Sequence, residues 1–349
     1  MNNNKFNNNI FKIIDICNKD NVIVSGLSIK MALAMLLNGA KGESKDQLIN
    51  FFDKSIEELN NETKERLLES NDSIKFANAF WFRTPNEANE EYAKIIKEFQ
   101  NAQINIDDFS LKSTLDKINN WVSDNTNGLI EKILDNISGV ISLLINTLYF
   151  KDSWSNPFEE RLTHDEIFYG LKNNNVKMMK NTTKYYFENK YAKGFGLYYE
   201  NSPYEFIGIL PNNEGNFKIE DLDLNNFNHK SGNYNVYVDF PKLDIEFSTE
   251  LSDCLKKLGV EKPFAAGDDF TSMLSVAQTV DKVIHKTNFK LDEKGTEAAA
   301  ATVVLMVRGA SMRQQDKIEI NLKFNRPFAF MIRHIKTNEL LFVGKISNL

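Results

Sequence analysis

Cysteine, glycine and proline are all scarce in this chain, and each scarcity excludes a class of protein. The two cysteines, Cys17 and Cys254, cannot form a framework of several disulfides, and they fit no metal-binding spacing. We therefore interpret both as buried or idle thiols that give no sign of an oxidising compartment. Sixteen glycines and seven prolines among 349 residues exclude collagen-like and loop-dominated chains.

Long apolar runs and basic patches are missing as well. A membrane-spanning helix needs about 18 consecutive apolar residues, and the longest uncharged stretches, Gly139–Phe150 and Ala298–Val307, are shorter. The amino terminus has no signal-peptide pattern. The Lys and Arg residues are scattered, and the net charge is −6. We therefore expect neither a membrane nor a nucleic acid among the partners.

Motifs of catalytic and metal sites are not found either. The chain has no Gly-x-Ser-x-Gly elbow, no P-loop and no His-Glu-x-x-His sequence. Its histidines are widely separated, at His164, His229, His285 and His334. These positions suit structural or surface roles better than the role of a catalytic base. We predict that the protein is not an enzyme and uses no metal or cofactor.

What the chain does have is the composition of a large globular core. Hydrophobic residues make up 42% of the sequence, and 26 Phe, 11 Tyr and 3 Trp supply ample aromatic area. Length alone suggests about two domains. No linker or low-complexity segment interrupts the chain, however, so we predict one α+β domain over residues 1–349.

Helical spacing dominates the first third of the chain, and strand patterns dominate the rest. The nearly continuous apolar run Val140–Phe150 is typical of a central strand that is buried on both faces. Ser28 is expected to cap the helix that follows it. Helices are expected over residues 9–17, 29–37, 44–52, 55–68, 89–99, 111–123 and 249–258. Strands are expected over residues 21–25, 74–82, 140–150, 279–291, 318–324, 328–334 and 340–346, and within 168–247.

The segment Glu293–Thr302 does not fit an ordinary loop. Gly295 breaks regular structure, four alanines follow at Ala298, Ala299, Ala300 and Ala301, and a β-rich run leads to Arg308. Alanine favours a helix, whereas the flanking valines favour a strand. If the segment forms a strand, the side chains on one of its faces are small and uncharged at the leading end. Such a face suits a strand that enters a packed sheet. A buried Ala-rich helix or a hairpin edge remains the alternative.

The motifs around this segment resemble, in their order, those of the serpin family of protease inhibitors. The resemblance covers almost the whole chain, and it rests on the order and spacing of the motifs together. Two of them are Asn146-Thr-Leu-Tyr-Phe-Lys-Asp-Ser-Trp154 and the hinge-like Glu293–Thr302. Further matches are Asn21–Ile29, Leu36–Ser44, Ile118–Val122, Val176–Met179, Phe240–Leu243, Asp269–Thr271, Phe324–Phe328 and Phe342–Lys345.

The resemblance implies a serpin fold with about nine helices, three β-sheets and an exposed reactive loop at about residues 293–317. In the family a protease attacks this loop and forms an acyl-enzyme, and the cut loop then inserts into the main sheet as a new strand. The fold must therefore be metastable. Glu293, Gly295, Thr296 and Ala298–Ala301 match the hinge, which carries no charge from Ala298 to Val307. We expect an active inhibitor that works as a suicide substrate.

Arg308 is the only basic residue between Lys294 and Arg313, so the expected cut lies between Arg308 and Gly309. An arginine there fits a trypsin-like serine protease, whose primary pocket supplies a carboxylate. The commonest family spacing would place the cut one residue later, after Gly309, and Met306 and Arg313 also stay open. The alternative function is a non-inhibitory serpin that acts as a binding or chaperone-like module.

The resemblance also assigns positions that control conformation. Ser25, Ser28, Asn146 and His285 match a polar cluster beneath the point where the main sheet opens, called the shutter. Trp154 matches the aromatic residue at the breach, where the loop first enters. A monomer is expected. The 44 asparagines and the trimmed amino terminus suggest a poxvirus-type serpin. Localisation stays open, because the missing signal favours the cytoplasm of an infected cell and the Arg reactive residue favours secretion.

Overall fold

The computed structural model describes residues 4–17, 19–85, 87–265, 267, 269–274, 280, 282–296 and 317–349. The predicted reactive-bond residues Arg308 and Gly309 therefore lie outside the described residues. The same holds for Ala298–Ala301 of the predicted hinge and for the alternative cut positions Met306 and Arg313. Glu293, Gly295, Thr296 and all five predicted shutter and breach residues are described.

The chain forms two compact units, and each is described by itself. The first comprises residues 1–17, 24–150 and 246–288, and the second comprises residues 18–23, 151–245 and 289–349. The chain passes from one unit to the other inside the strands β12 (Leu243–Glu250) and β13 (Lys282–Leu291). That the whole chain is a single domain stays a prediction.

The first unit contains the α-helices of the described residues. They begin within three residues of the predicted starts, except α1, which begins five residues earlier than predicted. The cap of α2 is Ser25, which has an extended backbone and accepts a hydrogen bond from the N–H of Ser28. The prediction that Ser28 caps this helix is therefore wrong, because Ser28 already lies in the first turn. The helices are α1 (Asn4–Cys17), α2 (Gly26–Gly39), α3 (Gly42–Phe52), α4 (Ile56–Leu68), α5 (Glu90–Gln100), α6 (Lys112–Asn125) and α7 (Ser252–Lys257).

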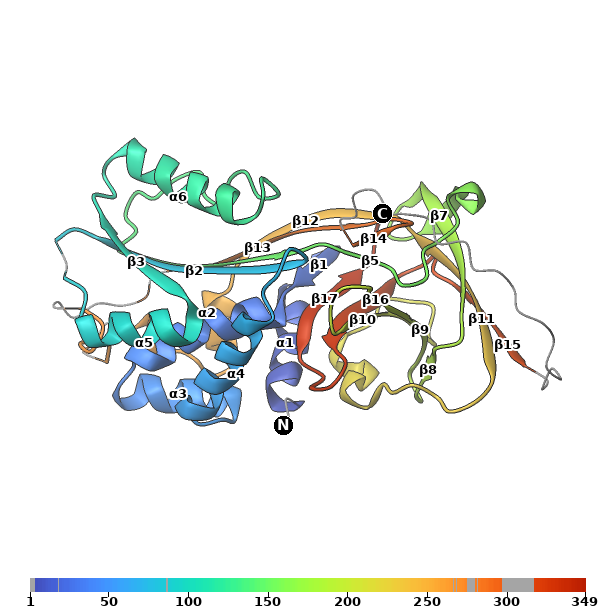
Figure 1. Cartoon of the computed structure of the whole chain (residues 1–349), viewed down its shortest axis with the longest axis horizontal. Coiled ribbons are helices and arrows are strands. Elements are labelled where there is room, and N and C mark those ends of the chain that lie inside the picture. The colour runs from blue at the N-terminus through green and yellow to red at the C-terminus, as the bar shows by residue number, and fades with distance from the viewer. Residues whose placement is uncertain are drawn as a thin grey trace. The chain divides into compact units, whose positions relative to one another are not determined.

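The sheet of the first unit is built on one buried central strand, β4 (Ser142–Phe150). Eight of its nine residues are buried, as expected for a strand covered on both faces. It pairs antiparallel with β2 (Ile74–Arg83) and parallel with β13 over Lys282–Ile284. β3 (Ala102–Asp107) lies parallel to β2 at the edge. In Figure 1, α6 lies on one side of β2 and β3, and α2 and α5 lie on the other.

Strand β3 was not expected from the sequence. Its six residues include only two large apolar side chains, Ile104 and Ile106, so the alternation that indicates a strand is weak. The hydrogen-bonded pairing with β2 holds these residues as a strand instead.

The second unit is mostly strand. A six-stranded sheet has the order β1-β17-β16-β10-β9-β8, and a four-stranded sheet has the order β15-β11-β7-β6. The third sheet of the chain has the order β3-β2-β4-β13-β14-β5, with β12 beside β13. The strands not yet given are β1 (Asn21–Val24), β5 (Asp152–Ser153), β6 (His164–Tyr169), β7 (Asn173–Thr183), β8 (Tyr186–Glu188), β9 (Ala192–Tyr198), β10 (Tyr204–Pro211), β11 (Tyr234–Pro241), β14 (Gly295–Thr296), β15 (Ile318–Lys323), β16 (Phe328–His334) and β17 (Leu340–Ile346).

Phenylalanine fills the core of the second unit. Phe240 lies within 5.6 Å, centroid to centroid, of four other phenylalanine rings, all of them edge to face or tilted. Such pairs add stability beyond the apolar area that they bury. Three sheets and an α+β content agree with the predicted fold class, and the described residues contain seven α-helices and four short 3₁₀ helices. Within the described residues, no helix is long and apolar enough to cross a membrane.

Candidate functional site

The predicted hinge begins as a short strand in the second unit. Gly295 and Thr296 form β14, which pairs antiparallel with Leu291 of β13 on one side and with β5 on the other. Gly295 is required here, because an added Cβ would lie 2.1 Å from the carbonyl oxygen of Asp152. The first two residues of the hinge are thus already held between two strands.

Thr296 is fixed by an aromatic pair. Its side chain is only 2% exposed, and its hydroxyl lies 2.5 Å from the hydroxyl of Tyr199. The Tyr199 ring stacks on Trp154, with ring centroids 4.6 Å apart. Burial raises the pKa of Tyr199 well above 10, so this hydroxyl stays protonated.

Trp154 donates hydrogen bonds to the residues just before β14. Its backbone N–H donates to the carbonyl of Lys294 at 2.8 Å, and its indole N–H donates to the carbonyl of Asp292 at 3.1 Å. The residue predicted at the breach therefore lies beside the start of the hinge.

Glu293 is a buried carboxylate with two partners. One oxygen accepts a hydrogen bond from Thr163 at 2.7 Å, and the other lies 2.7 Å from the ammonium of Lys242. Burial alone would raise the pKa of Glu293, but the hydrogen bonds from Lys242 and Thr163 outweigh burial, and the pKa lies below its usual value. The end of β13 is thereby anchored to residues far away in the sequence.

Replacing Lys242 should loosen this anchor. In Lys242→Ala the buried Glu293 loses its cation, and we expect the free energy of unfolding to fall by about 2 kcal/mol. Lys290→Ala is the matched control, because the pair between Lys290 and Asp244 is well exposed at both ends and should contribute less than about 1 kcal/mol. Denaturant unfolding of both variants measures the difference, and equal losses would contradict the anchoring role of Lys242.

The four residues predicted at the shutter meet in the first unit. His285 accepts the backbone N–H of Ser25 through Nε2 at 3.1 Å, and the hydroxyl of Ser28 donates to the side chain of Asn146. All four residues are at most 6% exposed. Three separate segments, α2, β4 and β13, are therefore joined by one buried polar cluster.

The cluster extends further than the sequence predicts. Asn146 donates to Asn78 of β2, and Asn78 donates to the carbonyl of Gln100 at 2.5 Å. The amide of Gln100 in turn reaches Asn60 of α4 at 2.9 Å. A polar residue at position 78, inside a strand of large apolar residues, was the available signal for this extension.

His285 is held neutral by its surroundings. Burial lowers its pKa from 6.5 to about 4, since the charged imidazolium would lose its hydration. Well above pH 6.5 the imidazole is neutral in both the folded and the unfolded chain, so it does not lower the free energy of unfolding. As the pH falls from 6.5 toward 4, the unfolded chain binds a proton that the folded chain excludes, so stability declines by about 1.4 kcal/mol per pH unit.

His285→Gln should remove this part of the pH dependence. A glutamine oxygen can still accept the N–H of Ser25, but it does not titrate. We expect the wild-type protein to lose about 2 kcal/mol more stability than the variant between pH 6.5 and pH 5. Thermal or urea unfolding at both pH values tests this expectation, and parallel pH profiles would refute it.

Comparison with known proteins decides the family. A family model described as serpin (serine protease inhibitor) matches residues 1–349. This chain belongs to the serpin family. The family supports a role as a protease inhibitor, and it implies a target protease as the partner.

Individual serpins match over nearly the whole chain. An uncharacterized serpin-like protein of Thermococcus kodakarensis is 32% identical, covering 95% of this chain and 81% of the relative. Human serpin B4 is 29% identical, covering 99% of this chain and 98% of the relative. The crystal structure of tengpin, a thermophilic serpin in the native state, has a TM-score of 0.86 and 29% identity over 99% of this chain and 94% of that chain. Archaeal and human relatives give no support to the poxvirus-type origin that composition suggested.

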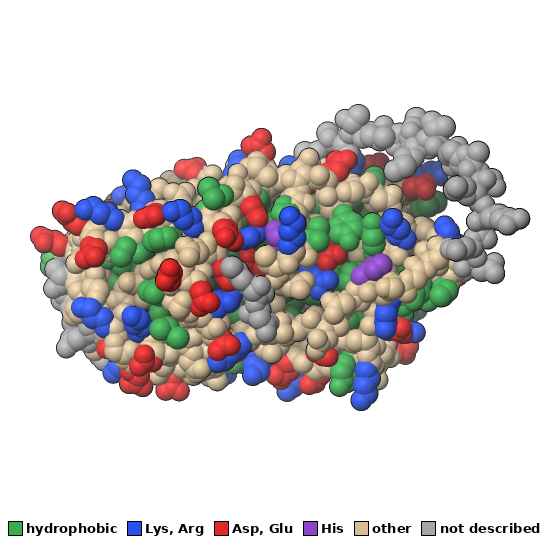
Figure 2. Space-filling view, turned by 60° about the horizontal axis from the view of Figure 1, so that its bottom comes forward, with side chains coloured by type: hydrophobic (Ala, Val, Ile, Leu, Met, Phe, Trp, Pro, Cys, Tyr) green, Lys and Arg blue, Asp and Glu red, His purple; other side chains and the backbone are tan. Residues whose placement is uncertain are grey.

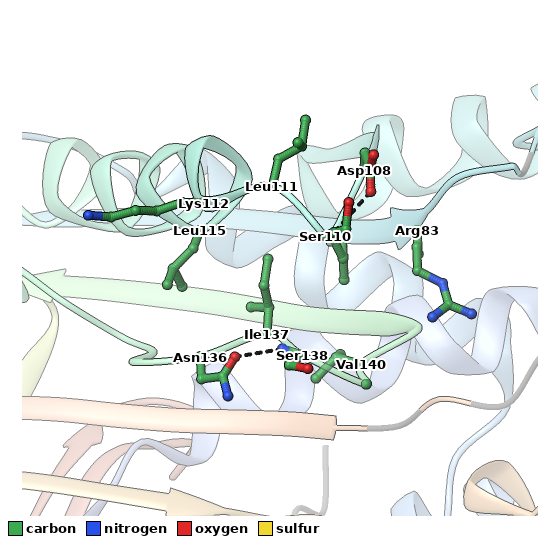
Figure 3. A pocket seen from close by; sticks show the side chains of 12 residues that line it. Arg83, Asp108, Ser110, Leu111, Lys112, Leu115, Asn136, Ile137, Ser138 and Val140 are labelled. Carbon is green, nitrogen blue, oxygen red and sulfur yellow. Dashed lines mark hydrogen bonds between the residues drawn. The ribbon is translucent and has the colours of Figure 1, made fainter.

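One hollow of this serpin is lined by residues of the loops around the start of α6. The hollow has a volume of about 470 Å³, and Leu115 and Ile137 point toward one another there (Figure 3). Its polar groups bond within their own loops, since Asp108 accepts from the N–H of Ser110 and Asn136 from that of Ser138. In the part of the chain that the structure describes, no group of three His, Cys, Asp or Glu could hold a metal.

One face of this serpin is mixed in charge. Figure 2 shows Lys and Arg side chains interspersed with Asp and Glu over the face that is drawn. On that face the basic side chains form no continuous stripe.

Proposed function

We propose that this serpin inhibits a trypsin-like serine protease as a suicide substrate. The protease attacks the loop after Arg308, an acyl-enzyme forms, and the cut loop inserts into the sheet that contains β14. The trapped protease is then held as a covalent acyl complex. Serine attack on the carbonyl of residue 308 breaks the 308–309 peptide bond, and the new amino terminus leaves with Gly309.

The observation that carries the proposal is the position of Thr296. It is buried and paired on both sides, and the residues after it, from Ala298 to Val307, are uncharged. Extending β14 passes first through Glu297, which in a strand falls on the face opposite to Thr296 and Ala298 and would point to solvent, and the residues from Ala298 to Val307 then bring no charge into the sheet.

Specificity rests on Arg308, the one basic residue between Lys294 and Arg313. A guanidinium is recognised by a carboxylate at the bottom of a primary pocket. No aspartate occurs between Glu297 and Gln315, so proteases that cut after aspartate do not fit the loop.

A non-inhibitory serpin remains the second candidate. Thyroxine-binding globulin has this fold, with a TM-score of 0.84 at 22% identity, and it was solved in complex with thyroxine. The fold alone therefore does not distinguish inhibition from ligand carriage. The uncharged run from Ala298 to Val307 favours the inhibitory function.

Incubation with trypsin at several molar ratios tests the proposal. We expect a band that survives boiling in SDS and has the summed mass of trypsin and the amino-terminal part of the serpin. A panel of proteases that prefer other residues should form much less complex. Cleavage without any complex at every ratio would refute the inhibitory function and favour the non-inhibitory one.

A further inference from the structure

The only two cysteines of the chain lie next to each other. Cys17 is the last residue of α1, and Cys254 lies in α7, and their sulfur atoms are 3.9 Å apart. Both residues belong to the first unit, and they lie 237 positions apart in the sequence. Both are thiols in this structure. The interpretation of idle thiols does not account for this contact.

The surroundings make one sulfur reactive and leave the other within reach of solvent. Cys254 is 6% exposed, whereas Cys17 is only partly buried. The hydrogen bond from Cys17 lowers the pKa of Cys254 to about 7, with help from Lys257 and against the opposing effects of burial and Asp253. A large fraction of Cys254 is therefore thiolate at neutral pH, and the thiolate is the nucleophile in cysteine oxidation.

We propose that Cys17 and Cys254 form a reversible intramolecular disulfide when the protein meets a peroxide. The Cys254 thiolate attacks one oxygen of hydrogen peroxide, the O–O bond breaks, and a sulfenic acid and hydroxide result. Cys17 then attacks the sulfenic sulfur, the S–O bond breaks, and the S–S bond forms. The two cysteines lose two electrons and two protons in all, and the peroxide becomes two molecules of water. A dithiol reduces the disulfide back to the two thiols and is itself oxidised to a disulfide.

The geometry allows the bond with a small movement. A disulfide needs a sulfur separation of about 2.05 Å, so the two atoms must approach by about 2 Å. Cys17 ends α1, and the last turn of a helix has backbone carbonyls without helical partners, so it can adjust at little cost. Rotation of the two side chains supplies the rest.

The disulfide would join α1 to the segment that holds β13. The backbone N–H of Leu251, which precedes α7, donates to the carbonyl of Val283 at 2.9 Å. The N–H of Val283 reaches the hydroxyl of Ser252 at 3.4 Å. A cross-link between α1 and α7 thus restrains α7 and β13, and it closes a very long loop in the unfolded chain. We infer that oxidation stabilises the first unit, and this inference does not depend on the proposed inhibitory function.

Peptide mapping after oxidation tests the bond directly. The full-length protein is treated with hydrogen peroxide at neutral pH, blocked with an alkylating agent and digested with trypsin. Residues 13–19 and 243–256 are the two tryptic peptides that contain cysteine. We expect them to appear joined, lighter by two hydrogens than their sum, and to separate when dithiothreitol is added. Disulfide-linked dimers on a non-reducing gel, or sulfinic acid at Cys254 without the joined peptide, would overturn the proposal.

Cys17→Ser is the matched variant, because it removes the resolving thiol at a partly exposed position and keeps a hydroxyl that can donate a hydrogen bond to Cys254. We expect it to stop at sulfenic or sulfinic acid on Cys254. The midpoint of thermal unfolding, measured at a fixed scan rate, should rise by about 5 °C on oxidation of the wild type and should not rise in the variant. A joined peptide with an unchanged wild-type midpoint would overturn the stabilising role.

Discussion

Thr296→Arg should turn this serpin from an inhibitor into a substrate of trypsin. Thr296 is 2% exposed and its hydroxyl contacts Tyr199. Because Thr296 already lies in the sheet, an arginine there would keep residues 295 and 296 out of the sheet in the uncut protein, and bringing the unpaired guanidinium in after the cut would cost several kcal/mol. A penalty of about 3 kcal/mol on insertion lowers the ratio of trapped to released protease about a hundredfold. SDS gels at equal molar ratios measure that ratio.

Thr296→Ser is the control for this variant, since it keeps a small side chain and a hydroxyl beside Tyr199. We expect the serine variant to form the complex as the wild type does. Both variants should be cut by trypsin, which shows that the loop is still recognised. A covalent complex of Thr296→Arg in wild-type yield would mean that trapping does not require this residue to be buried.

Arg308→Ala should nearly abolish the reaction with trypsin. The guanidinium is the group that the primary pocket of a trypsin-like protease binds, and truncating one partner of such a charge pair costs about 4 kcal/mol. The second-order rate of complex formation should therefore fall about a thousandfold. Progress curves with a chromogenic trypsin substrate measure this rate.

Arg313→Ala separates the two basic residues of the loop. We expect it to react with trypsin at the wild-type rate. Mass spectrometry of the released carboxy-terminal fragment then identifies the bond, because a fragment that begins at Gly309 places the cut after Arg308. A fragment that begins at Ala310, or a slow Arg313→Ala variant, would assign the cut elsewhere.

The sequence predicts helices and strands well where its apolar residues form a clear helical or strand pattern. The apolar run Val140–Phe150 becomes the buried strand β4, and the helix predicted over residues 55–68 is α4, which begins at Ile56. The α2 cap was misplaced by three residues because two serines, Ser25 and Ser28, both fit the pattern. Only the backbone conformation at Ser25 distinguishes them.

The partners of the hinge could not be predicted in the same way. Glu293 was recognised, but Thr163 lies 130 positions away and Lys242 lies 51 positions away. Tyr199, which holds Thr296, is 97 positions away. Such contacts depend on which strands become neighbours in the sheet, and no local sequence pattern shows which strands will pair. The shutter residues were found only through the family resemblance, and Asn78 and Gln100 beside them were not found at all.

In the proposed mechanism, the short strand β14 gives loop insertion a direction. Closing a chain segment onto a sheet is most costly at its first contact, because the entropy of closure is lost before many hydrogen bonds form. With Gly295 and Thr296 already paired, this initiation has taken place before any protease arrives. Each later residue only lengthens an existing strand. Insertion should then proceed residue by residue from the hinge toward the cut end. A bulky residue at position 298 should therefore slow insertion at an earlier stage than a bulky residue at position 306.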